Sequence, residues 1–290
     1  MRRNSIMKEM NKTLKIYAFA DEADFLVDGQ IAAMKRNGLD GLEIRNVDGA
    51  SVSDITIAKA KEVKQKLADN GLVVWSVGSP IGKIDIVSGD WSGHMDKFRH
   101  TLEIAHELEA KNIRLFSFYI PEHHNPKDYK EEVINRMGKL LDIAKGSGVC
   151  LCHENEKGIY GDIATRCLDI HKALPEIKGI FDPANFVQCE QDTMEAWDML
   201  QSHIKYLHIK DAMLDGKVVP AGKGAGNVEA IVRSFIAQGG NALTIEPHLA
   251  IFKGLAGLER EGEKSNVEEY VYANNNEAFD AACQALKQIL

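Results

Sequence analysis

The chain has 290 residues, of which 44% are hydrophobic and 27% are charged, the composition of an ordinary globular protein. Its formal net charge of -8 is unsuited to neutralising phosphates, so nucleic acid and anionic membranes are poor partner candidates. No apolar run approaches the ~20 residues of a transmembrane helix. The first twenty residues also lack the apolar core of a signal peptide.

We expect residues 1–12 to form a polar N-terminal lead-in and residues 13–290 to form one domain. No stretch rich in Pro, Gly or Ser divides the chain into two parts. The cysteines number five, which is odd, and their spacing fits neither a disulfide framework nor a Cys-x-x-Cys zinc site. This pattern is typical of reduced cysteines in a cytoplasmic protein.

Short β-branched or aromatic runs alternate with longer amphipathic segments along the chain. The runs that predict strands are "KIYAFA" (15–20), "GLEIR" (41–45), "VVWSVG" (73–78), "IRLFSFY" (113–119), "VCLCHE" (149–154), "KGIFDP" (178–183), "KYLHIK" (205–210) and "ALTIEP" (242–247). The intervening segments have the i, i+3, i+4 apolar spacing of helices, and several end in Gly. Strand followed by helix, eight times, predicts an α/β fold of the (β/α)₈ TIM barrel type.

A doubly wound open sheet is the alternative fold. Such a sheet normally carries a glycine-rich phosphate turn after its first strand. Here that turn reads "FADEADF" and contains no glycine. The barrel is therefore favoured.

Acidic and histidine residues cluster at the ends of the last four predicted strands, where a barrel carries its active site. Alternation of side chains along a strand places residues i and i+2 on one face. The residues that this rule turns toward the barrel mouth are Glu154, Asp182, His208 with Lys210, and Glu246 with His248. The same rule turns His153 away from the mouth and makes Cys150 and Cys152 barrel filling.

Glu154, Asp182, His208 and Glu246 together provide three carboxylates and one imidazole. Hard oxygen donors with one nitrogen suit Mn²⁺, our favoured ion, and also Mg²⁺, Co²⁺ or Zn²⁺. Without a cation, three converging carboxylates would repel one another. Taken singly, each acid could instead be a strand-end carboxylate paired with a lysine such as Lys210.

Four short motifs in this order carry a family resemblance: Glu-Asn after strand five, "FDPANF" after strand six, "HIKD" after strand seven and "IEPH" after strand eight. The chain resembles the xylose isomerase-like TIM barrels, which include sugar phosphate isomerases and epimerases. The resemblance implies one divalent metal ion held by the four residues above and no organic cofactor. It also implies a carbohydrate substrate, and we expect a homo-oligomer, either a dimer or a tetramer.

Similarity to the ketose 3-epimerases of this family implies that Glu154 and Glu246 are also the acid/base pair. They would remove and return a proton beside a carbonyl, through an enediolate stabilised by the metal ion. Two positions depart from the family pattern, because Asn185 and Glu156 stand where relatives often carry histidine. The metal-dependent DNA-repair endonucleases of the superfamily need further His and Asp ligands that this acidic chain lacks.

Substrate contacts are predicted for Glu156, Asn185, Lys210 and His248, each with support of the metal ligands as the alternative. Lys223 joins them because it lies in a glycine-rich loop, "PAGKGAGN", that resembles a loop of the family. The first functional hypothesis is a metal-dependent isomerase or epimerase of a sugar, sugar phosphate or keto-polyol. A lyase or dehydratase acting on a keto-sugar or keto-inositol would use the same enediolate. A non-catalytic sugar-binding barrel is the third hypothesis.

Overall fold

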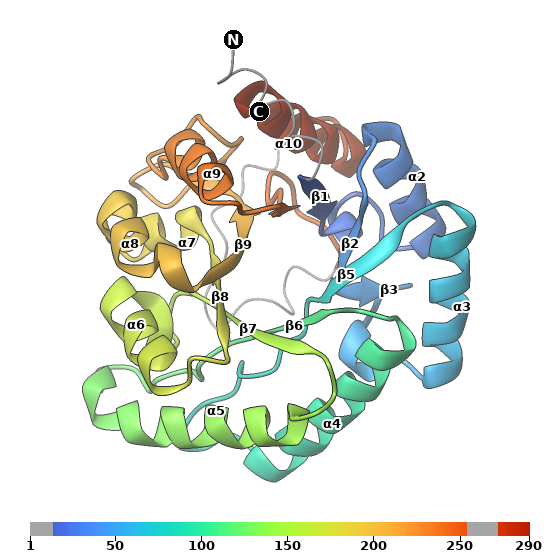
Figure 1. The fold of residues 1–290 in the computed structure, drawn as a ribbon. Coiled ribbons are helices and arrows are strands. Elements are labelled where there is room, and N and C mark those ends of the chain that lie inside the picture. Colours follow the sequence, from blue (N-terminus) through green and yellow to red (C-terminus); the bar gives the residue numbers. More distant parts are fainter. Residues whose placement is uncertain (1–13, 254–271) are drawn as a thin grey trace.

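The fold is taken from a computed structural model of the chain that describes residues 14–253 and 272–290. The predicted lead-in, residues 1–12, lies outside the described residues. Within them, Figure 1 shows a central ring of strands surrounded by helices. The predicted (β/α)₈ barrel is therefore confirmed.

The barrel strands are all parallel to their neighbours and close into a ring in the order β1-β12-β9-β8-β7-β6-β5-β2. They are β1 (Lys15–Ala18), β2 (Gly41–Ile44), β5 (Val73–Val77), β6 (Asn112–Leu115), β7 (Cys150–Glu154), β8 (Lys178–Phe181), β9 (Ile204–Ile209) and β12 (Ala242–Ile245). Every predicted strand is present. The prediction for β6 extends too far, because the strand ends at Leu115, and Phe118 has a φ of 65°.

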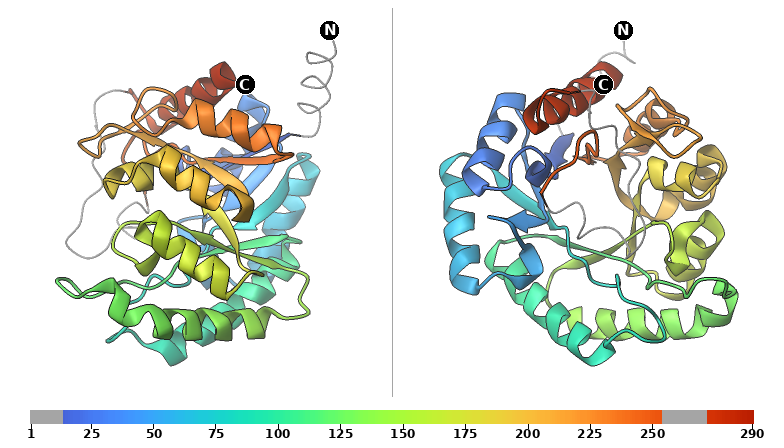
Figure 2. Two further views of the ribbon diagram at one scale, coloured as in Figure 1. Left: turned by 60° about the vertical axis from the view of Figure 1, so that its left-hand side comes forward. Right: turned by 180° about the vertical axis from the view of Figure 1, so that it is seen from behind.

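The helices form the outer layer, which Figure 2 shows from two further directions. They are α2 (Val27–Asn37), α3 (Ile57–Asp69), α4 (Trp91–Glu107), α5 (Lys130–Ala144), α6 (Ala164–Ala173), α7 (Pro183–Gln188), α8 (Thr193–Leu200), α9 (Val228–Ala237) and α10 (Asn275–Ile289). Helix α2 ends as its sequence predicts, because Gly38 adopts the left-handed conformation there, with a φ of 67°. In α3, Ala60, Val63 and Leu67 recur at helical spacing and form the buried face.

Short elements connect these layers. They are the two-stranded sheets β3 (Asn46–Val47) with β4 (Ala50–Ser51) and β10 (Asp211–Ala212) with β11 (Val218–Val219), and the single turns η1 (Ala20–Glu22), η2 (Val52–Asp54), η3 (Pro126–Tyr129), η4 (Tyr160–Asp162) and η5 (Gln201–His203). Sequence periodicity does not predict the two small sheets, because each of their strands has only two residues. The sheet β10–β11 begins the loop that carries Lys223.

Aromatic side chains fill the barrel beneath the polar residues at the mouth. The rings of Tyr17 and Trp75 stack with their centroids 4.9 Å apart, and Tyr206 packs edge-on against Trp75. Cys152 belongs to the same cluster, and Cys150 packs against it with its thiol free. The prediction that these two cysteines fill the barrel is confirmed, and the aromatic layer closes the barrel below the site.

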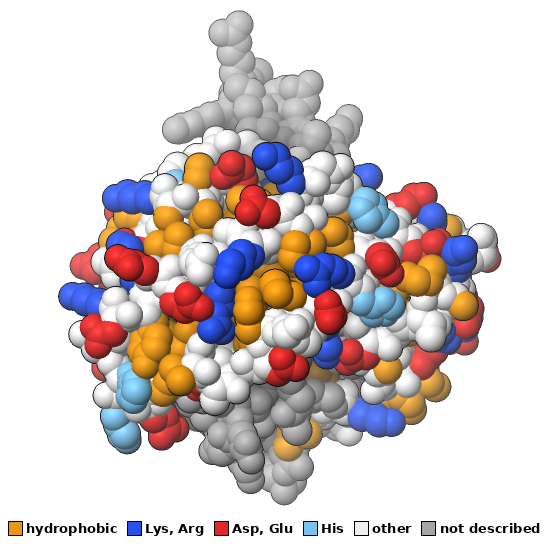
Figure 3. Space-filling view, turned by 90° about the horizontal axis from the view of Figure 1, so that it is seen from below, with side chains coloured by type: hydrophobic (Ala, Val, Ile, Leu, Met, Phe, Trp, Pro, Cys, Tyr) orange, Lys and Arg blue, Asp and Glu red, His pale blue; other side chains and the backbone are white. Residues whose placement is uncertain are grey.

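The outer surface over α4 and α5, which lie at the bottom of Figure 1, carries charges of both signs. Figure 3 shows lysines and arginines interspersed there with aspartates and glutamates, with apolar side chains between them. In the ranges that the structure describes, no helix has both the length and the apolar character needed to cross a bilayer.

Buried neutral histidines make the fold sensitive to acid, and His94 in α4 is the clearest case. Its Nε2 accepts a hydrogen bond of 2.7 Å from the backbone N–H of Gly82, which requires this nitrogen to be unprotonated. Burial, with help from the charge of Lys97, lowers the pKa of His94 to about 4. An unfolded histidine titrates near ~6.5. The unfolded chain therefore gains a proton before the folded chain does.

We predict that stability falls as pH drops from about 6.5 to about 4, with His94 contributing up to about 3 kcal/mol of the loss. The variant His94→Gln keeps an acceptor for Gly82 but cannot titrate. Its free energy of unfolding, measured by urea denaturation at several pH values, should fall less steeply than that of the wild type. The exposed His106→Gln serves as the control and should follow the wild type. Equal acid loss in wild type and His94→Gln would contradict the assignment.

Candidate metal centre

The four predicted ligands meet at the carboxyl ends of four adjacent barrel strands. Glu154 ends β7, Asp182 follows β8, His208 lies in β9 and Glu246 follows β12. One donor atom from each lies within 4.8 Å of the donor atoms of the others, and all four side chains are buried. Sequence alternation thus predicts a group that the fold does bring together.

Glu154 uses its two oxygens differently. Its Oε1 lies 2.9 Å from Nδ1 of His208, on the inner side of the group. Its Oε2 accepts a hydrogen bond of 3.1 Å from Nη1 of Arg114, a buried residue of β6. Burial alone would raise the pKa of Glu154, but the charges of His208 and Arg114 lower it to about 2. The carboxylate is therefore ionised at neutral pH.

The two oxygens of Glu246 also have different partners. Its Oε2 accepts a hydrogen bond of 3.0 Å from Nζ of Lys210 and lies 3.5 Å from Nδ1 of His208. Its Oε1 accepts one of 3.2 Å from Nη1 of Arg45. Burial opposes ionisation of this carboxyl as well, but Lys210 and His248 hold its pKa well below the usual value.

Asp182 connects the barrel to helix α7. Its negative charge is the least compensated by positive charge among the three carboxylates. Its Oδ1 caps the helix by accepting a hydrogen bond of 3.0 Å from the backbone N–H of Asn185. Nζ of Lys210 lies 2.8 Å from its Oδ2, yet this buried oxygen accepts no hydrogen bond from the described residues. Burial, together with the nearby carboxylates, raises the pKa of Asp182 to about 7 despite Lys210.

His208 is held between carboxylates on both sides of its ring. Its Nε2 lies 3.0 Å from Oε2 of Glu43, a β2 residue whose other oxygen accepts a 2.8 Å hydrogen bond from the hydroxyl of Tyr206. Burial would lower the pKa of His208, but Glu154 and Glu43 raise it well above the usual value. These contacts fix the ring with Nδ1 turned toward Glu154 and Glu246.

The charge balance of the region fits a divalent cation. An imidazole binds a metal ion only without its second proton, so metal binding removes the positive charge of His208. Arg45, Arg114 and Lys210 are then left with more carboxylates than they can neutralise. The carboxylates buried there are Asp21, Glu22, Glu43, Glu154, Asp182 and Glu246. An ion held by three carboxylate oxygens and one imidazole nitrogen would supply the missing positive charge.

A second acidic group lies beside the first and shares Glu246 with it. Glu22, Glu246 and His248 also offer donor atoms within 4.8 Å of one another. Here the chain supplies its own cation, because Arg45 donates hydrogen bonds to Oε1 of both Glu22 and Glu246. His248 completes this network, with Nδ1 3.1 Å from Oε1 of Glu22. We therefore interpret the second group as an ion-pair network.

The residues predicted to contact substrate fall into two sets. Lys210, Asn185 and His248 lie within the buried network, where Asn185 donates to the backbone oxygen of Asn155 and, at 3.4 Å, to Oε1 of Glu154. Glu156 is partly exposed and forms a 2.8 Å ion pair with Lys83. Lys223 is exposed, and in the described part of the chain no side-chain hydrogen bond or ion pair connects it to the four ligands. Substrate binding by all five remains a prediction.

Asp211 organises the loop that carries Lys223. Its carboxylate accepts hydrogen bonds from four backbone N–H groups, those of Ala212, Gly222, Gly224 and Gly226, at 2.8–3.0 Å. A Cβ atom at Gly224 would lie 2.4 Å from the carbonyl oxygen of Ala212, and one at Gly226 would lie 2.6 Å from Oδ1 of Asp211. The glycines are therefore required for the backbone to close around this carboxylate.

Sequence reasoning missed Glu43, Arg45 and Arg114, although all three are buried and contact the predicted ligands. The alternation of side chains that identifies the predicted ligands also applies to these three residues. Glu43 and Arg45 are two residues apart at the end of β2, and Arg114 lies near the end of β6. The alternation rule used on the last four strands would have found them on the first four.

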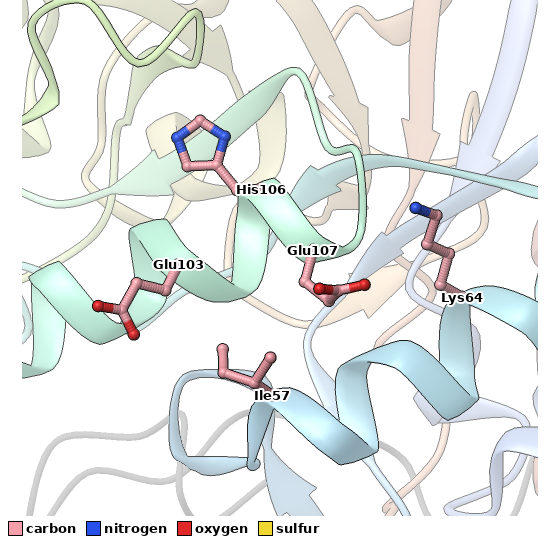
Figure 4. Close-up of a pocket in the computed structure, with 5 residues that line it drawn as sticks. All are labelled: Ile57, Lys64, Glu103, His106 and Glu107. Atoms are coloured by element: carbon pink, nitrogen blue, oxygen red, sulfur yellow. The ribbon is translucent and has the colours of Figure 1, made fainter.

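A separate pocket lies on the outside of the barrel between α3 and α4. Figure 4 shows its lining residues, Ile57 and Lys64 from α3 and Glu103, His106 and Glu107 from α4. None of the predicted site residues lines it, and its charges are mixed. The four predicted metal ligands lie elsewhere, at the carboxyl ends of the barrel strands.

Solved structures with the same architecture cover nearly the whole chain. The probable 3-DHS dehydratase AsbF of Bacillus anthracis superposes with a TM-score of 0.72 at 14% identity, covering 94% of this chain and 99% of that chain. The IOLI protein, solved with a bound zinc atom, gives a TM-score of 0.72 at 15% identity, with coverages of 95% and 98%. D-psicose 3-epimerase of Clostridium cellulolyticum H10, solved with D-tagatose, gives 0.70 at 16% identity, again with 95% and 98%. At these identities the likeness establishes the fold.

The family follows from the sequence itself. A search of curated proteins finds no match to the chain. The family described as "Xylose isomerase-like TIM barrel", by contrast, matches residues 31–283, which is most of the chain. The four motifs, the closed parallel barrel and this match agree, and the protein belongs to the xylose isomerase-like TIM barrel family.

Proposed function

We propose that the protein is a divalent-metal-dependent isomerase or epimerase of a sugar, a sugar phosphate or a keto-polyol. The observation that carries the proposal is the convergence of Glu154, Asp182, His208 and Glu246, whose donor atoms lie within 4.8 Å of one another. Structural relatives support it, since they include a psicose epimerase, a protein solved with bound zinc and a Mycobacterium smegmatis barrel solved with magnesium. Mn²⁺ remains our favoured ion, and no organic cofactor is required.

A bound divalent ion would polarise the substrate carbonyl as a Lewis acid and so acidify the neighbouring C–H bond. The protein's own contribution is proton transfer. One of the two glutamates, as the carboxylate, removes the proton from this carbon and leaves an enediolate. The other, which must have taken up a proton by the time the substrate is bound, gives that proton to the same carbon. One oxygen of each glutamate lies within 3.5 Å of Nδ1 of His208, so both carboxylates border the same small volume.

Burial of this region supports catalysis over simple binding. Glu154 and Glu246 have exposed fractions of 1% and 4%, so bulk water has little access to a reactive enediolate formed between them. A binding protein needs polar contacts to a sugar but has no use for three converging carboxylates. The non-catalytic barrel is therefore the weaker hypothesis.

Metal binding should stabilise the folded chain. At a hundredfold excess over its dissociation constant, Mn²⁺ should raise the melting temperature by roughly 5 °C, because only the folded state assembles the four ligands. Differential scanning calorimetry after chelation and re-addition measures this shift. Elemental analysis of the purified protein identifies the ion that it retains.

A matched pair of variants separates the metal centre from helix capping. Asp182 caps α7 and Asp192 caps α8, and asparagine is an equally good cap. Asp182→Asn should reduce the Mn²⁺ stabilisation, because an amide oxygen is a weaker ligand than a carboxylate, whereas Asp192→Asn should leave it unchanged. A melting temperature that does not respond to any divalent ion in the wild type would refute the proposed centre.

Replacing Glu246 by glutamine should separate proton transfer from metal binding. Glu246→Gln keeps an oxygen donor but loses the basic carboxylate, so turnover should fall by about 10²–10⁴-fold while most of the metal affinity remains. The measurement is deuterium incorporation by NMR in D₂O, with a panel of ketoses, their phosphates and keto-polyols. Glu103→Gln on the surface of α4 is the control. Full activity in Glu246→Gln would remove this residue from the mechanism.

The same assay distinguishes the reaction classes. Deuterium in an unchanged carbon skeleton indicates isomerisation or epimerisation. Loss of water or another β-leaving group indicates the lyase alternative, for which AsbF, described as a probable dehydratase, offers a precedent on this fold. Binding of a sugar without exchange or turnover in the wild type would favour the non-catalytic barrel.

A further inference from the structure

Each carboxylate of the candidate metal centre has one outer oxygen, held by an arginine or a backbone N–H, and one inner oxygen. Lys210 contacts the inner oxygens of Asp182 and Glu246. For Glu154 the anchor is Arg114 on Oε2, and for Glu246 it is Arg45 on Oε1. The inward oxygens are Oε1 of Glu154 and Oε2 of Glu246, the two that approach Nδ1 of His208. Asp182 follows the same rule, with its Oδ1 tied to the N-terminus of α7.

The two arginines contact these glutamates through a single hydrogen bond each, although a guanidinium can bond both oxygens of a carboxylate. Elsewhere in the chain, Arg36 grips both oxygens of Asp280. Arg45 likewise donates to both oxygens of Asp21, through Nε and Nη2. Only its Nη1 donates to Glu246. The second oxygen of Glu246 is thereby left without a guanidinium partner.

Both guanidinium groups are fixed before any ligand binds. Arg45 lies over the rings of Phe19 and Phe252, with its carbon Cζ 4.4 Å and 5.0 Å from their centroids. Arg114 lies 4.9 Å from the rings of Phe19 and Phe116 and donates to the backbone oxygen of Gly78. Both side chains are nearly inaccessible to solvent, at 3% and 4%.

We infer that Arg45 and Arg114 are positioning residues that hold Glu246 and Glu154 as single-oxygen ligands, which keeps two positions of the metal ion open for substrate. The inference rests on the proposed function. Carboxylates bind metal ions through one oxygen or through both, and a six-coordinate ion with four single donors retains about two free positions. A glutamate released from its arginine can rotate and occupy one of them.

The inference is tested by counting exchangeable waters on Mn²⁺ in the purified protein. Water-proton relaxation, calibrated by EPR in ¹⁷O-enriched water, should give about two waters per ion in the wild type. In Arg114→Met and in Arg45→Met the number should fall to about one, while the Mn²⁺ dissociation constant changes by less than about tenfold. With substrate, KM should rise more than kcat falls, because the open positions are those that bind it.

Two further variants make the test specific. Arg114→Lys retains one charged donor for Oε2 of Glu154 and should restore the second water, which a general loss of packing would not do. Arg166→Met removes a guanidinium that bonds Asp162, outside the metal centre, and should keep the wild-type count. Circular dichroism of each variant verifies that it is folded.

The outcomes separate this inference from the proposed function. An unchanged water count in folded Arg114→Met and Arg45→Met would overturn the positioning role and leave the metal site intact. Fewer than about two waters on the wild-type ion would overturn it without any variant. If the wild type binds no divalent ion, the proposed function fails and the inference fails with it.

Discussion

The burial of several carboxylates at one end of the barrel is the constraint on which this structure depends. Removing a single carboxylate from water costs several kcal/mol unless it meets positive charge and hydrogen-bond donors, and a folded domain has only about 5–15 kcal/mol of net stability. The positive charge and the donors come from two arginines, a lysine and two histidines. These residues lie in or shortly after β2, β6, β9 and β12. The positions of these cations determine which oxygens remain available for chemistry.

The cations of the region divide into fixed and adaptable ones. Arg45 makes four hydrogen bonds to carboxylates and is enclosed by aromatic rings, so it has little freedom to move. Lys210 is different, because one flexible ammonium group serves both Asp182 and Glu246. It lies on the inner side of the group, where it would have to adjust if an ion occupied the centre. The arginine therefore holds its carboxylates rigidly, whereas the lysine can adjust its position between its own two.

Much of the fold and part of the site are predictable from the sequence because both follow local rules. Strand–helix alternation predicts the barrel, and the period of two predicts which of Cys152, His153 and Glu154 faces its interior. His153 does turn away, toward the hydroxyl of Ser117. The anchoring contacts are not local, since Arg45 and Glu246 are 201 residues apart and Glu43 and His208 are 165 apart. Only closure of the ring brings such pairs together, which is why periodicity alone does not reveal them.

The loop closed around Asp211 has a consequence for how this protein can change over evolutionary time. Its shape depends on a carboxylate that binds backbone amides and on glycines that permit the close approach, and not on the side chains at its tip. Mutations at exposed tip positions such as Lys223 can therefore alter what the loop presents to solvent without refolding it. Descendants of this protein can thus acquire new surface contacts through such substitutions while the buried carboxylates at the strand ends remain unchanged.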